Sequence, residues 1–167
     1  MRLPALGLRP LAALLAALLA FIWVSSLGLP PIVASHFDAA GRADGFMPRG
    51  AYALLMSAVV AGLPLLVALL PTALMGRDGR NLNIPHRAYW LAPQRRKATL
   101  AFIRHGGRWF AVLLALFMAL LHWQVVQAQT RQPPRLADAP FWLWLALLLG
   151  ATAAWIAVLL RRFRRPG

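Results

Sequence analysis

The chain has 167 residues, of which 60% are hydrophobic and 13% are charged. A soluble domain has about 25% charged residues, so this composition excludes an ordinary soluble globular protein. No cysteine is present, which excludes disulfides, thiolate metal sites and thiol nucleophiles. The formal charge of +14 would indicate nucleic-acid binding in a soluble protein, but the placement of the charges indicates another cause.

Four apolar runs predict four membrane-spanning helices, because about 20 helical residues cross a bilayer core of about 30 Å. We place these spans at residues 11–27, 51–75, 109–126 and 141–160. The first run follows Arg2 and Arg9, which also fits a secretory signal peptide, although we favour a retained helix. The second run is interrupted by Gly62, Pro64 and Pro71, and such breaks are tolerated in membranes when neighbouring helices satisfy the freed carbonyls.

The longest connector, residues 76–108, is polar and basic. Pro93 is suited to the first turn of a helix because its missing N–H is not needed there. We therefore expect a short amphipathic helix from Pro93 to about His105, with Leu100 and Ile103 facing lipid. Gly106-Gly107 is expected to end or kink that helix before the third span.

The basic residues predict the orientation of the chain in the membrane. One side holds two basic residues before the first span, eight in residues 76–108 and four after the fourth span. The other side holds only Arg42, Arg49, Arg131 and Arg135. Lys and Arg stay cytoplasmic, so we expect a bacterial-type cytoplasmic (inner) membrane protein with both termini inside. Every basic cluster adjoins a span, so anionic lipids are the expected partner of residues 76–108, and no nucleic acid is expected.

Small residues at every fourth position suggest how the helices pack. Lipid tails provide no hydrophobic drive for helix association, so close backbone approach at small residues matters. An alanine-rich chain also produces such stripes by composition alone. The stripes are Ala12/Ala16/Ala20, Ser57/Ala61, Ala111/Ala115/Ala119 and Ala146/Gly150/Ala154. We predict an all-α membrane protein: a compact antiparallel bundle of four transmembrane helices with a small extracytoplasmic loop cap at residues 28–50.

This outward loop carries most of the chemistry in the first half of the chain. His36, Asp38 and Asp44 provide imidazole and carboxylate groups, which suit zinc or another divalent ion, and His122 could complete such a site. An ionisable residue at span depth, such as His122, is a functional candidate by default. The alternatives are that the aspartates shape turns while His36 locks the loop onto the bundle, or that these groups take part in proton-coupled chemistry.

Two segments of the chain resemble a known family. Leu29-Pro30, Val33, His36-Phe37, Gly41, Asp44, Phe46 and Arg49 resemble the pattern of the domain of unknown function 1648 family. This module lies near the start of SdpI-type membrane proteins, whose named members are toxin-immunity factors, and the resemblance covers about residues 11–75. It includes the junction after the first run, which favours a retained helix there. Ala34 departs from the family pattern where proline is usual, and Phe46 departs where tryptophan is common. A second block resembles short members of the family through Asn83, Pro85, Arg87, Tyr89, Trp90 and Pro93.

These observations favour a binding, sensing or immunity-like protein rather than an enzyme. The expected motif or ligand-binding residues are His36, Phe37, Asp38, Gly41, Asp44 and His122. A protein or peptide partner is a further expectation, and no cofactor is expected. A small transporter or channel is the alternative, although the spans offer few polar side chains for a path. A membrane metal-binding protein or metalloenzyme is the third hypothesis.

Overall fold

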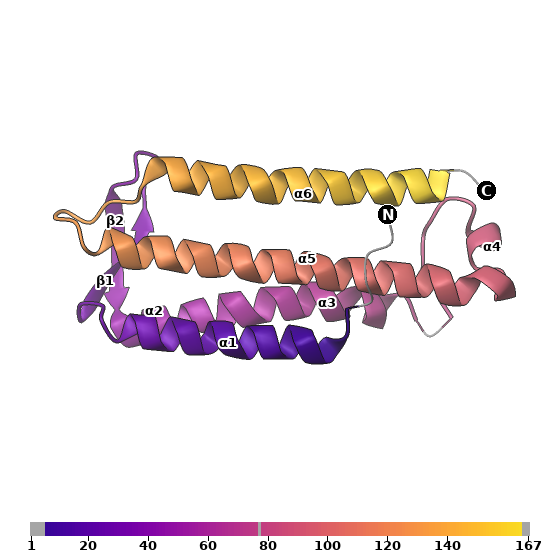
Figure 1. Cartoon of the computed structure of the whole chain (residues 1–167), viewed down its shortest axis with the longest axis horizontal. Helices are drawn as coiled ribbons and strands as arrows, with labels where there is room; N and C mark the ends of the chain where they lie inside the picture. The colour runs from indigo at the N-terminus through magenta and orange to yellow at the C-terminus, as the bar shows by residue number, and fades with distance from the viewer. Residues whose placement is uncertain (1–5, 77, 165–167) are drawn as a thin grey trace.

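The computed structural model describes residues 6–76 and 78–164 and shows long helices joined at one end by a β-hairpin (Figure 1). Four helical stretches of the described chain are long and apolar enough to cross a membrane. The protein is therefore a multi-pass, predominantly α-helical membrane protein, as predicted. The elements in chain order are α1 (Leu8–Ser26), β1 (Ile32–Phe37), β2 (Ala43–Pro48), α2 (Arg49–Ser57), the π-helical turn η1 (Ala58–Gly62), α3 (Leu63–Leu74), α4 (Arg87–Trp90), α5 (Pro93–Ala128) and α6 (Asp138–Arg164).

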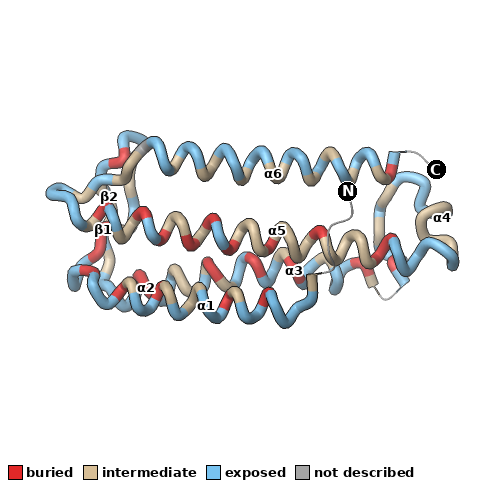
Figure 2. The backbone as a smooth tube through the Cα atoms, in the orientation of Figure 1, coloured by how far each residue is buried: buried red, intermediate tan, exposed pale blue. Residues whose placement is uncertain are grey.

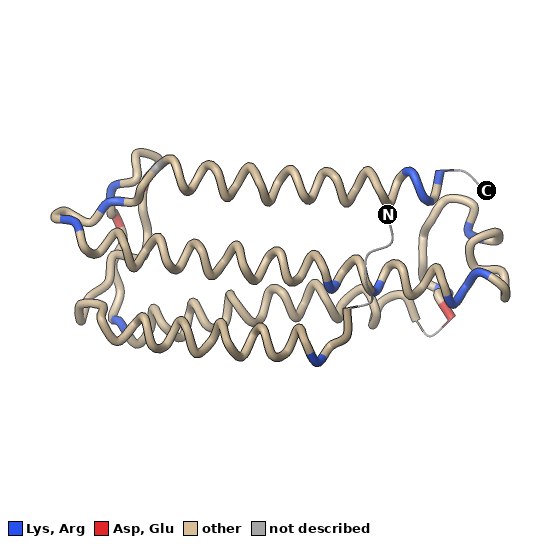
Figure 3. Tube along the Cα trace, in the orientation of Figure 1, with Lys and Arg blue, Asp and Glu red and all other residues tan. Residues whose placement is uncertain are grey.

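The two ends of the bundle differ in structure. The hairpin end consists of β1, β2 and the connector of residues 129–137, and the basic end consists of residues 75–76 and 78–92 with the adjoining ends of α5 and α6. Figure 3 shows Lys and Arg toward these two ends, while a long middle part of the bundle carries none. Arg2, Arg77 and Arg165, which contribute to the predicted charge bias, lie outside the described residues.

The second span is a helix with a π-turn in its middle. η1 ends at Gly62, two residues before Pro64, which has no N–H to donate to the carbonyl four residues earlier. The predicted interruption at Gly62 and Pro64 therefore takes the form of a π-turn. Pro71 lies inside α3, and the helix continues through it to Leu74.

Three of the four spans form the packed core. Leu11 and Leu15 of α1 meet Ala68 of α3 and Ala111 and Ala115 of α5 in one buried cluster. α6 packs chiefly along α5, and Figure 2 shows it mostly exposed. The expected compact four-helix bundle is thus a three-helix core with a fourth helix attached to one side.

Only one of the four predicted small-residue stripes is buried within the chain. Ala111, Ala115 and Ala119 are at most 7% exposed, so the stripe in α5 packs as predicted. Ser57/Ala61 is half-buried, whereas Ala12/Ala16/Ala20 and Ala146/Gly150/Ala154 are exposed. The reason is complementary size: α1 presents its leucines to the alanines of α5, so the small residues of α1 are not needed at that contact.

α5 is one continuous helix, so of the two alternatives predicted for Gly106-Gly107, an end or a kink, the end was wrong. A Cβ added at Gly106 would overlap the indole ring of Trp155 in α6, so this glycine serves helix packing rather than a break. Pro93 begins the helix as predicted. Leu100 was expected on lipid but is buried, and it lies against the loop at Gly79.

Candidate functional site at the hairpin end

The segment predicted as a loop cap forms a two-stranded antiparallel hairpin. β1 pairs with β2, and the register is irregular around His36. A Cβ added at Gly45 would lie 2.8 Å from the His36 Cβ, so this irregular pairing requires glycine opposite the histidine. At the base of the hairpin, Leu29, Val33 and Tyr52 form a buried cluster that joins the strands to α2.

Asp38 organises the hairpin turn. Its Oδ1 accepts hydrogen bonds from the backbone N–H groups of Ala40 at 2.9 Å and Arg42 at 2.8 Å, and its Oδ2 accepts one from the Arg42 guanidinium at 3.0 Å. The Arg42 backbone bond is the largest of the interactions that lower the pKa of the Asp38 carboxyl. Gly41 has a φ of +73°, which suits glycine at the tip. Asp38 therefore shapes the turn, whereas Asp44, which was given the same role in that alternative, bonds to His36 instead.

His36 and Asp44 form an ion pair on the surface of the hairpin. His36 Nδ1 lies 2.5 Å from Asp44 Oδ1, and the two side chains are 73% and 48% exposed. Ion pairs as exposed as this contribute about 0–1 kcal/mol to stability, because water competes with the partners. The pair is therefore not what holds the hairpin on the bundle.

Two other side chains attach the hairpin to the helices. The Gln129 amide accepts from the Ala34 N–H at 3.1 Å and donates to the Ala34 carbonyl at 3.0 Å. The Arg49 guanidinium donates to the carbonyls of Leu27 at 3.1 Å and Leu29 at 3.0 Å, next to the end of α1. A proline at position 34, usual in the family pattern, has no N–H for this bond with Gln129. The departure at Ala34 thus has a structural use.

His122 is fully buried between α1 and α2, away from the hairpin surface. Its Nε2 lies 2.7 Å from Ser25 Oγ, and its Nδ1 lies 2.9 Å from the Tyr52 hydroxyl. Ser25 Oγ already donates its proton to the Phe21 carbonyl at 2.6 Å, so it accepts from His122 Nε2–H. Tyr52 then donates to the unprotonated Nδ1. With these bonds, Ser25, His122 and Tyr52 all have hydrogen-bond partners while the imidazole is neutral.

The expected metal site is not assembled. His36 is paired with Asp44 and Asp38 with Arg42, while His122 faces Ser25 and Tyr52. Within residues 6–76 and 78–164, no three His, Cys, Asp or Glu side chains are close enough together to hold a metal ion.

Sequence reasoning missed Ser25 and Tyr52 as partners of His122. A signal was available, because a histidine inside a span requires hydrogen-bonding partners on neighbouring helices. Ser25 lies near the end of the first span and Tyr52 near the start of the second, at the same end of the bundle as His122.

A cavity of about 540 Å³ lies beneath the hairpin. His36 and Asp38 of the hairpin line it, and the rest of its wall comes chiefly from α2, η1, α5 and the start of α6. Gln124 lines it and is 8% exposed, yet neither its amide nitrogen nor its amide oxygen has a hydrogen-bond partner in the described chain. A buried polar group without a partner costs about 1–3 kcal/mol, so this amide is an unusual wall residue.

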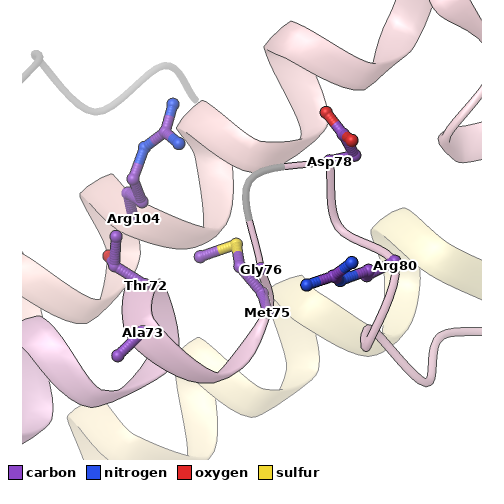
Figure 4. Close-up of a pocket in the computed structure, with 7 residues that line it drawn as sticks. All are labelled: Thr72, Ala73, Met75, Gly76, Asp78, Arg80 and Arg104. Carbon is purple, nitrogen blue, oxygen red and sulfur yellow. The ribbon is translucent and has the colours of Figure 1, made fainter.

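A second pocket, of about 720 Å³, lies at the basic end (Figure 4). Arg104 reaches it from α5 and Arg80 from the connecting loop, and Thr72 lies at the end of α3. Asp78 is the one acidic residue among its described lining residues, and it lies 4.0 Å from Arg96, at the limit of an ion pair. The pocket therefore has a net positive lining.

The second predicted motif surrounds α4 at the basic end. Trp90 packs edge-on against Phe163 of α6 at 5.5 Å between ring centroids, and the Arg95 guanidinium lies 4.0 Å above Tyr89. Arg87 donates to the Arg80 carbonyl at 2.7 Å. Asn83 and Pro85 are exposed, and Pro93 starts α5. The described contacts of this motif thus join α4 and the loop before it to α5 and α6.

The helices and the hairpin define a multi-pass membrane protein with a strand-bearing cap. Residues 11–62 match the family model described as Domain of unknown function (DUF1648), which confirms the resemblance of the first of the two segments. The match covers most of α1, the hairpin, α2 and η1, and the motif around α4 lies beyond it. The description names no activity, so the match gives none to this chain. No curated protein and no solved structure matched the chain.

Proposed function

We propose that the protein is a non-enzymatic binding or sensing protein of the cytoplasmic membrane, with its hairpin end facing outward. The orientation rests on the excess of Lys and Arg at the basic end and on the rule that such residues stay cytoplasmic. Both termini then lie in the cytoplasm.

The observation that carries this proposal is the exposed His36–Asp44 pair, whose histidine lines the hairpin-end cavity. The pair contributes little to stability, since Gln129, Arg49 and Asp38 make the bonds that position the hairpin. An imidazole in the cavity lining, with a carboxylate bonded to it, offers a ligand both nitrogen and oxygen groups. We therefore assign His36 and Asp44 to ligand contact.

Binding fits the interior of the bundle better than transport does. The two pockets lie at opposite ends, and the core between them is the packed cluster of Leu11, Leu15, Ala68, Ala111 and Ala115. A polar solute would have to cross this apolar layer without hydrogen-bonding partners, which is costly.

At the basic end, we propose anionic lipid as the partner. Arg80 and Arg104 line a pocket there with a net positive charge. Each basic residue near an anionic leaflet contributes about 1 kcal/mol of attraction.

The test is native mass spectrometry of the full-length chain released directly from its membrane. Val59 lines the hairpin-end cavity, so Val59→Phe should fill part of it, whereas Val158→Phe places the same ring on the exposed face of α6. We expect a bound small molecule on the wild type and on Val158→Phe, and its loss from Val59→Phe. A wild-type chain with no bound mass, or equal occupancy in both variants, contradicts the proposal.

His36→Ala and Asp44→Ala test the role of the His36–Asp44 pair. Because the pair is exposed, both variants should accumulate in the membrane like the wild type and lose bound ligand. His86→Ala is the matched control, since His86 is an exposed histidine at the basic end. Failure of His36→Ala to accumulate would show that the histidine locks the hairpin instead.

A further inference from the structure

Two buried polar side chains near the hairpin end, Ser26 and Gln124, have no hydrogen-bond partner among the described residues, and of these two Gln124 lines the cavity. Gln129 pairs both its amide atoms with Ala34, and His122 pairs both its ring nitrogens. Gln124 is buried, at 8% exposure, yet its amide makes no bond within the described residues. Its position in the cavity wall makes the cavity the place where a partner can reach it, after rotation of its flexible side chain.

We propose that the hairpin-end cavity binds an amphiphile of the outer leaflet whose head carries a hydrogen-bond donor and an acceptor, as a primary amide does, and that Gln124 recognises this head. This inference rests on the proposed function and adds the class of ligand. A glutamine amide has one acceptor oxygen and two donor hydrogens. A ligand group that both donates and accepts hydrogen bonds can therefore pair with both its oxygen and its nitrogen. A ketone or ether head only accepts hydrogen bonds, so it can pair with the amide nitrogen but not with the amide oxygen.

The rest of the cavity suits an apolar tail. Met118 and Leu121 of α5 and Val59 of η1 continue the wall from Gln124 toward the middle of the bundle. Met118 lies six residues before Gln124, which is about 9 Å along a helix. Met56 and Met118 are flexible side chains that can adapt to tails of different shape.

The arrangement also matches the way a lipid lies in a bilayer. The polar groups His36, Asp38 and Gln124 are near the hairpin end, and the apolar wall extends toward the bundle centre. The walls belong to the spans formed by α2–η1, α5 and α6, while α6 has its extensive helix contacts with α5 alone. With the hairpin outward, a molecule of the outer leaflet reaches the cavity with its head already level with Gln124.

The experiment compares two probes of similar length, decanamide and 2-undecanone, on the full-length protein in lipid nanodiscs. The amide has a donor and an acceptor, and the ketone has an acceptor only. Thermal unfolding followed during titration of each probe gives the dissociation constants, because a ligand that binds the folded state raises Tm. We expect decanamide to bind the wild type about tenfold more tightly than 2-undecanone.

Gln124→Met removes the amide while keeping the length of the side chain. In this variant we expect the affinity ratio of the two probes to fall to about one, and Tm without a probe to stay equal or rise. Gln127→Met is the control, because Gln127 is an exposed glutamine on the same helix and should keep the wild-type ratio. A lower Tm of Gln124→Met without a probe would show a structural role and overturn the inference.

Three further results would overturn the inference. Equal binding of the two probes to the wild type would remove the amide selectivity, and a tenfold ratio that persists in Gln124→Met would assign it to another residue. Tighter binding of a short apolar peptide, acetyl-Leu-Leu-amide, than of decanamide would show a peptide site instead. In each case the proposed function stands or falls separately, by the Val59→Phe comparison of bound mass.

Discussion

The indole of Trp155 lies against the backbone of Gly106, in the place where any other residue would put its Cβ. This contact belongs to the limited packing that attaches α6 to the three-helix core, along with the ring contact between Trp155 and Phe102 at 5.4 Å. The glycine pair that suggested a helix break is therefore part of a helix–helix contact.

Gly106→Ala should lower the free energy of unfolding by about 1–3 kcal/mol, because the added methyl overpacks the contact with Trp155. Unfolding of the purified protein in mixed micelles by increasing detergent fraction measures this change. Gly150→Ala on the open face of α6 is the control and should have little effect, since a Cβ there meets nothing within 4 Å. Gly106→Ala combined with Trp155→Leu should recover part of the loss, and no recovery would place the cause elsewhere.

Tyr52→Phe should destabilise the protein by about 1–3 kcal/mol, because it leaves the buried Nδ1 of His122 without a donor. The same micelle unfolding experiment measures this loss. Ser57→Ala removes a hydroxyl that bonds only within its own helix, to the Ala53 carbonyl, and should cost less. The double variant Tyr52→Phe/His122→Phe should lose less than the sum of its two single changes, because it removes both partners together. If the losses of the two single variants add up in full in the double variant, the hydrogen bond between Tyr52 and His122 is contradicted.

The spans were predictable because each is a long apolar run, and this property does not depend on contacts elsewhere in the chain. The predicted span at residues 51–75 corresponds to a helical stretch at Arg49–Leu74, and the predicted span at 141–160 lies within α6. The contact partners of each helix were less predictable, because leucine in α1 and alanine in α5 are equally apolar and only their fit decides which face is buried.

The site at the hairpin end was predictable in its residues but not in its pairings. Asp38 had the turn chemistry expected of aspartate beside glycine, and the hairpin contains it in that role. The pairing of His36 with Asp44 depends on a strand register that the sequence does not reveal, and the strands themselves are short. The sequence around Gln124 did not single it out, because what distinguishes it is the lack of a hydrogen-bond partner on the surrounding described helices.

The hairpin turn should depend on acid pH through Asp38. Its pKa is lowered in the folded state, so its contribution to stability is fully present above the unfolded value of about 4. That contribution is lost as the pH falls through the lower folded value. Amide chemical shifts of Ala40 and Arg42, followed by NMR from neutral to strongly acidic pH, should change in this window. Asp38→Asn should abolish the change and Asp44→Asn should keep it; a transition in Asp38→Asn would assign the titration to another group.

Retention of anionic lipid should depend on the arginines that line the pocket at the basic end. Arg80→Gln combined with Arg104→Gln should lower the amount of anionic lipid retained after purification, because two of the lining charges are removed. Mass spectrometry of the extracted lipid measures the retained amount. Arg164→Gln is the control, since it removes a charge from the end of α6 outside this pocket. Equal retention in all three proteins would contradict the assignment.

Labelling of introduced cysteines tests the orientation on which both proposed sites depend, and the chain has no native cysteine to interfere. Ala39→Cys lies at the exposed hairpin tip and Asn83→Cys lies in the exposed loop at the basic end. Gly79 is a poor position in that loop, because it is buried and its φ of +72° favours glycine. If the basic end is cytoplasmic, a maleimide that cannot cross the bilayer should label Ala39→Cys in intact cells and Asn83→Cys only after permeabilisation. The reverse pattern would place the hairpin-end cavity in the cytoplasmic leaflet, and the outer-leaflet ligand would be ruled out with it.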